Sequence, residues 1–76
     1  MTKKRNFWRI KGMNPKQISP GEASGIIRTG KPNGLFYFRE RGLFVGIDNS
    51  RSELFEEEFD TLQDCLVWLA GEREMG

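Results

Sequence analysis

Hydrophobic residues in the second half of the chain change their spacing from every second residue to every third or fourth. Residues 35–38 read Leu-Phe-Tyr-Phe, and the following apolar run places Leu43, Val45 and Ile47 on one side of an extended chain. The short polar segment at residues 39–42 predicts a hairpin between two strands, because its Gly42 adopts positive φ at little cost.

A helix is predicted at residues 62–70. Leu62, Cys65, Leu66 and Leu69 recur at the spacing of one helical face, with Leu66 expected near its centre, and Gly71 follows as a stop signal. Val67 and Trp68 fall outside this stripe, Trp68 on its flank and Val67 nearly opposite.

Residues 53–59 fit two patterns. As a strand, they put Phe55 and Phe59 on one face and Leu54, Glu56 and Glu58 on the other. As a helix, the two phenylalanines would extend the stripe of residues 62–69. We favour a third antiparallel strand, because residues 60–61 resemble a new helix cap, and the helix remains the alternative.

The first half predicts one strand and one helix. Residues 6–11 alternate as a short strand, residues 12–17 form a connector, and Ser19-Pro20-Gly21-Glu22 combines a serine cap, a first-turn proline and a capping-box glutamate. Gly30 followed by Pro32 ends this helix.

The predicted fold is therefore α+β with the order β-α-β-β-β-α, a mainly antiparallel sheet and both helices on one face. Residues 1–5 are expected to form a flexible basic tail, residues 6–71 a single small domain, and residues 72–76 a frayed tail. At 76 residues, the chain buries one small core and leaves room for a binding surface.

The composition removes most catalytic chemistry. The chain has no histidine, and its one cysteine, Cys65, lies on an apolar helix face, where a small buried hydrophobe is expected. The carboxylates look solvated, and residues 30–34 lack the spacing of a phosphate-binding loop. We therefore expect no enzyme activity, no catalytic residue, no cofactor and no metal site.

The sequence also favours a cytoplasmic protein. Arg9 and Lys11 interrupt the segment after the basic N-terminus, so no apolar signal region is expected, and no apolar run reaches the length of a membrane span. The single Cys65 agrees, because small secreted domains usually carry several paired cysteines.

Charge is divided unevenly along the chain. The net charge is +1, yet residues 1–51 hold eleven of the twelve Lys and Arg with three acids, whereas residues 52–76 hold eight acids and one Arg. Either the opposite charges of the two halves neutralise each other across the sheet, or they form two separate surface patches.

The leading functional hypothesis is a protein-interaction module that attracts a basic partner to an acidic face. Glu57 belongs to the same acidic run. The candidate partner-binding residues are Glu53, Glu56, Glu58, Asp60, Asp64 and Trp68.

The alternative hypothesis is nucleic-acid binding by the basic first half, with an aromatic side chain available for stacking on a base. The candidate residues are Lys3, Lys4, Arg5, Arg9, Lys11, Tyr37, Arg39 and Arg41. A homodimer is a third hypothesis, because exposed strand edges and the off-stripe Val67 and Trp68 favour self-association.

Two resemblances bear on these hypotheses. The segments Gly34-Leu-Phe-Tyr-Phe-Arg, Arg41-Gly-Leu-Phe-Val-Gly-Ile and Phe59-Asp-Thr-Leu-Gln-Asp resemble the three-stranded-sheet-plus-helix domains of plant AP2 factors and integrase arm-binding domains. That resemblance implies DNA binding through a basic sheet face.

The second resemblance covers residues 34–70. Phe44-Val-Gly-Ile-Asp-Asn, Glu57-Glu-Phe-Asp-Thr and Cys65-Leu-Val-Trp-Leu resemble segments of small uncharacterised proteins of bacterial phages and integrative elements. This resemblance implies an accessory protein that binds a host or element-encoded macromolecule.

Overall fold

In the computed structural model, residues 14–71 are described and form one four-stranded sheet with two helices. The elements follow the predicted order β-α-β-β-β-α. Their bounds are β1 Lys16–Gln17, α2 Pro20–Thr29, β2 Leu35–Glu40, β3 Leu43–Asp48, β4 Phe55–Phe59 and α3 Leu62–Leu69.

The sheet has the spatial order β1-β2-β3-β4 and is mostly antiparallel. Only β1 runs parallel to its neighbour, pairing Lys16 with Phe36, and the Ile18 amide extends this contact by donating to the Tyr37 carbonyl at 2.9 Å. The connector predicted at residues 12–17 thus contains a strand, whose two residues carry no hydrophobic alternation to reveal it. The strand predicted at residues 6–11 and both predicted tails lie outside the described residues.

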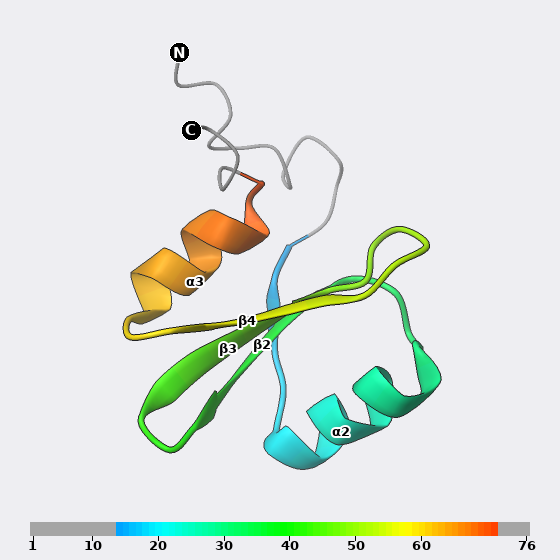
Figure 1. The fold of residues 1–76 in the computed structure, drawn as a ribbon, viewed down its shortest axis with the longest axis horizontal. Helices are drawn as coiled ribbons and strands as arrows, with labels where there is room; N and C mark the ends of the chain where they lie inside the picture. Colours follow the sequence, from blue (N-terminus) through cyan, green and yellow to red (C-terminus); the bar gives the residue numbers. More distant parts are fainter. Residues whose placement is uncertain (1–13, 72–76) are drawn as a thin grey trace.

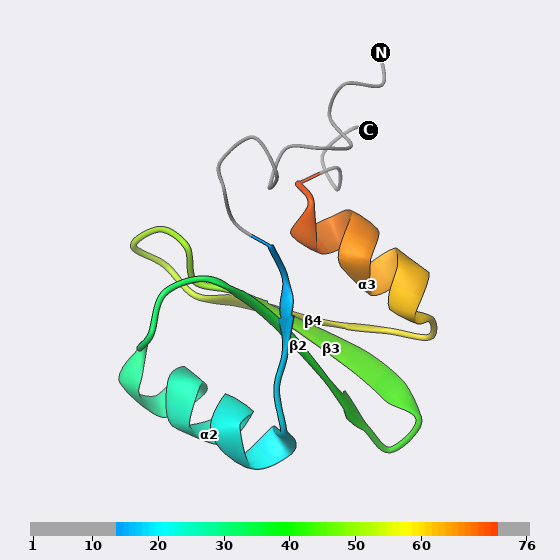
Figure 2. The same cartoon turned by 180° about the vertical axis from the view of Figure 1, so that it is seen from behind.

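The two helices lie on opposite faces of the sheet, so the prediction that both would cover one face is wrong (Figures 1 and 2). On one face, α2 packs Ala23 and Ile26 against Phe36, Phe38 and their neighbours in β3. On the other face, Cys65 and Leu69 of α3 pack with Leu35 of β2 in a second core cluster. The reason lies in β2, whose continuous apolar run at residues 35–38 exposes large side chains on both faces, each of which needs a cover.

Local signals at the helix ends act as predicted. The Ser19 hydroxyl accepts from the Glu22 amide at 3.1 Å, and the Glu22 carboxylate accepts from the Ser19 amide at 2.9 Å. Gly30 caps the other end in the left-handed region, with φ of 76°. Thr61 caps α3 by accepting from the Asp64 amide at 3.1 Å.

The ambiguous segment is a strand. β4 pairs antiparallel with β3 from Phe44 opposite Phe59 to Asp48 opposite Phe55, which confirms the favoured interpretation. The β2–β3 hairpin is also confirmed, and it turns through Arg41 and Gly42, both with positive φ.

Gly46 allows α3 to approach the sheet closely. A Cβ atom at this position would lie 3.1 Å from the Cys65 sulfur and 3.1 Å from two carbons of the Trp68 ring. We therefore expect Gly46→Ala to lower the free energy of unfolding by about 1–3 kcal/mol, because the helix must shift outward. Gly25→Ala is the matched control, since its Cβ would meet nothing within 4 Å, and urea unfolding of both variants measures the difference. Equal effects would contradict this packing.

Candidate functional site

Three of the predicted acidic residues lie in the outer strand β4, Glu53 and Asp60 flank it in sequence, and Asp64 lies in the first turn of α3. β4 is an outer strand, paired with β3 on one side and with no other strand among residues 14–71. Its sequence is Phe-Glu-Glu-Glu-Phe, and all three glutamates are exposed. We call the following set the acidic edge: Glu53, Glu56, Glu57, Glu58, Asp60 and Asp64.

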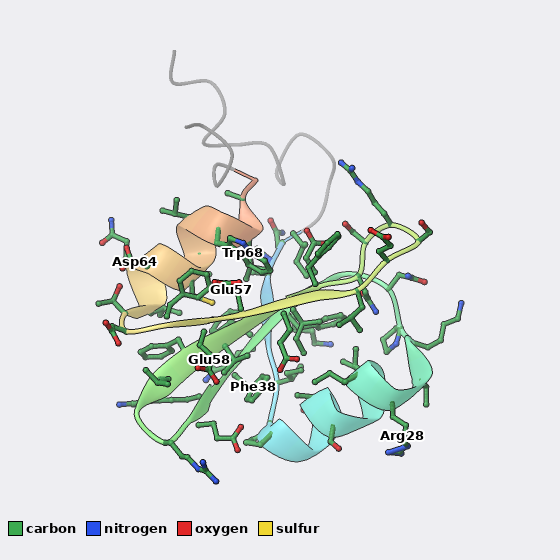
Figure 3. All side chains as sticks on the ribbon, viewed as in Figure 1. Arg28, Phe38, Glu57, Glu58, Asp64 and Trp68 are labelled. Atoms are coloured by element: carbon green, nitrogen blue, oxygen red, sulfur yellow. The ribbon has the colours of Figure 1, made fainter. Side chains whose placement is uncertain are left out.

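The acidic edge does not form one flat face. Glu56 and Glu58 stand opposite Ile47 and Val45 and so project on the α2 side, whereas Glu57 stands opposite Gly46 and projects on the α3 side. Figure 3 shows Glu57 and Glu58 on the two sides of β4, with Asp64 on α3. The predicted acidic face is therefore a carboxylate-lined rim along the side of the sheet.

Trp68 belongs to the core on the α3 side. Its ring packs against Phe59 with the ring centroids 5.7 Å apart, and it lies over Gly46. The side chain is half-buried, so its role as a partner-binding residue is limited to the exposed part of the ring. Val67, by contrast, is 40% exposed, as its place opposite the stripe predicted.

The predicted basic site is only partly within the described residues. Lys3, Lys4, Arg5, Arg9 and Lys11 lie outside them. Tyr37 and Arg39 share the α3 face of β2, where Tyr37 is half-buried against the second core cluster and the Arg39 guanidinium lies 5.1 Å from the centre of the Phe44 ring. Arg41 is exposed at the hairpin tip. Of the predicted basic residues, Arg39 and Arg41 are therefore the two cations that the described part of the chain places.

An open groove lies between α2 and the sheet, next to the acidic edge. Its volume is about 390 Å³. Its floor is apolar, because Ala23, Ile27 and Phe38 contribute to it, and carboxylates of Glu40 and Glu56 lie among its walls. Pro20, Ser24 and Arg28 complete the lining.

The sequence analysis did not identify this groove, although one signal pointed to it. Ile26 and Ile27 are adjacent in α2, and neighbouring helical residues point about 100° apart. Ile26 is buried in the core, whereas Ile27 is 41% exposed and lines the groove. Two consecutive isoleucines therefore indicated a hydrophobic face wider than one core requires.

The chemistry available elsewhere in residues 14–71 is limited. Cys65 is fully buried, and burial raises the pKa of its thiol to about 11, so the thiol stays protonated at neutral pH and offers no thiolate nucleophile. Within this part of the chain, no cluster of three acidic or cysteine side chains is arranged to hold a metal ion. No helix in it is long and apolar enough to cross a membrane.

Comparison with known proteins does not narrow the function of this chain. No protein-family model, curated protein or solved structure matches this chain. A functional conclusion therefore depends on the site geometry alone.

Proposed function

We propose that the protein is a non-enzymatic interaction module that binds a basic protein partner at the acidic edge. The observation that carries this proposal is an outer strand, β4, with three consecutive exposed glutamates and no basic residue. The resemblance to phage and integrative-element proteins supports an accessory role directed at a host macromolecule. The single Cys65 favours a cytoplasmic location.

Electrostatic attraction would act mainly on the rate of association. Carboxylates along one rim create a local negative potential that steers a basic partner, whereas the ordinary screening length of about 8 Å at physiological ionic strength limits its range. Because these side chains are solvent-exposed, they contribute to binding without supporting the core.

Charge reversal tests the proposal. In the double variant Glu56→Lys and Glu58→Lys, we expect the thermal midpoint to change little and the affinity for a lysine-rich peptide at low salt to fall by about tenfold or more. Fluorescence anisotropy with a labelled peptide measures the affinity, and circular dichroism measures the midpoint.

A matched pair of variants separates local from overall charge. Glu56→Gln with Glu58→Gln and Asn14→Lys with Gln17→Lys both raise the net charge by the same amount, but the second pair lies at the β1 end of the sheet. Only the first pair should weaken peptide binding strongly. Equal loss in both pairs would show that net charge, not the acidic edge, controls binding.

Nucleic-acid binding is the second candidate, favoured by Tyr37 and Arg39 on one face of β2 with Arg41 nearby. The helices α2 and α3 cover opposite faces of the sheet, and this disfavours insertion of a sheet face into the major groove of DNA. Salt-dependent gel retardation of the wild-type protein distinguishes the candidates, because a nucleic-acid-binding protein should retard DNA or RNA at low salt, whereas a module that binds basic peptides should not.

A further inference from the structure

The acidic edge and the α2 groove share one residue. Glu56 lies in the outer strand β4 and also lines the groove beside α2. An extended segment laid along β4 would place the side chains of every second residue on the α2 side, next to Glu56 and Glu58. One such side chain, opposite Glu56, would stand at the mouth of the groove.

The groove has the chemistry of a site for a long cationic side chain. Ile27 is 41% exposed and offers apolar surface for a methylene stem, and Glu40 and Glu56 offer carboxylates for its charged end. Lysine and arginine combine these two properties, because they bury the stem along apolar surface and keep the charged group beside acceptors. Arg28 also lines the groove, in the last turn of α2, so the cation is expected at the glutamate side.

The charge pattern of β4 selects the kind of strand that fits beside it. A second copy of β4 would bring glutamates opposite glutamates, which disfavours self-pairing. A strand carrying lysine or arginine would instead place opposite charges in neighbouring positions. Strand addition also satisfies the outward backbone groups of an edge strand, which supplies affinity beyond charge.

We propose that the partner presents an extended basic segment that adds to β4 as a further strand and places one lysine or arginine side chain in the α2 groove. This inference rests on the proposed function and specifies the class of partner and its mode of binding. It also names a specificity determinant, Ile27, that lies outside the acidic edge.

Two peptides of equal charge test the groove. One alternates lysine with threonine, and the other replaces each lysine by diaminobutyric acid, whose stem is two methylenes shorter. At mildly acidic pH both peptides are fully charged, so they attract the acidic edge equally. A buried methylene changes affinity by up to about fourfold, so we expect the lysine peptide to bind about tenfold more tightly.

Two protein variants with similarly exposed aliphatic residues provide the matched control. Ile27 is 41% exposed in the groove, and Val67 is 40% exposed on α3. Ile27→Ser should weaken the lysine peptide about fivefold and leave the shorter-stem peptide unchanged, whereas Val67→Ser should affect neither. Both variants are checked by thermal unfolding, and the ratio of the two peptide affinities within each variant is independent of any loss of folded protein.

Amide hydrogen exchange tests strand addition separately. Binding of the lysine peptide should slow exchange at alternate amides of β4, those directed away from β3, while α3 amides remain unchanged. Protection confined to α3 would overturn strand addition.

The outcomes separate the inference from the proposed function. If both peptides bind the wild-type protein equally and Ile27→Ser has no effect, the groove does not receive the side chain, and the acidic edge alone accounts for binding. If neither peptide binds at low salt, the proposed function fails and the inference fails with it.

Discussion

Replacing Leu69 by alanine is expected to lower the free energy of unfolding by about 2–5 kcal/mol. Leu69 is 2% exposed and packs with Leu35 and Cys65 in the cluster between α3 and the sheet. Truncation would leave a cavity that the short helix fills only by shifting. Urea unfolding monitored by the two tryptophans measures the change.

The neighbouring helix residues serve as internal controls for that result. Leu66, expected from the sequence to lie near the centre of the stripe, is half-buried, and Val67 is exposed. Leu66→Ala should therefore cost less than Leu69→Ala, and Val67→Ala should cost about 0.5 kcal/mol or less. A larger effect at Leu66 than at Leu69 would mean that α3 docks through a different face.

Asn49→Ala is expected to destabilise the protein by about 3 kcal/mol or more, through lost hydrogen bonds. Asn49 is 2% exposed, and its amide nitrogen donates to the carbonyls of Gly30 at 3.2 Å and Pro32 at 3.1 Å. Its side-chain oxygen accepts from the Gly34 amide at 2.7 Å. Alanine would leave these groups without their partner, and each unsatisfied buried group costs roughly 1–3 kcal/mol.

A less connected asparagine in the same region provides the comparison. Asn33 is exposed, and its side chain donates to the Asn49 carbonyl at 2.7 Å. Asn33→Ala should cost about 1 kcal/mol, the value of one ordinary hydrogen bond. If Asn49→Ala costs no more than Asn33→Ala in chemical denaturation, the α2–β2 connection does not depend on the Asn49 side chain.

The candidate site was predictable in its composition but not in its shape. Exposure of Glu56, Glu57 and Glu58 followed from their charge, because an unpaired carboxylate is costly to bury. That these side chains straddle an outer strand depended on where β4 joins the sheet. The groove required residues of α2, β2 and β4 to come together on one face of the sheet, which no local pattern in any of these segments specifies.

The sequence by itself determined the features whose partners lie close along the chain. Ser19 with Glu22, Gly30, the turn at Gly42 and the Thr61 cap each act within a few residues, so residue type and spacing suffice to place them. The order of the elements from α2 to α3 followed from these boundaries and from hydrophobic spacing.

Only the tertiary structure decided the features that join distant segments. Asn49 contacts groups 15 to 19 residues away, and β1 pairs with a strand 20 residues further on, without a local signal for either. The placement of the helices on opposite faces depended on the two-sided apolar surface of β2 and on the space that Gly46 leaves for Trp68. The physical reason is that burial is shared among segments, so each helix takes the face whose apolar area remains uncovered once the others have packed.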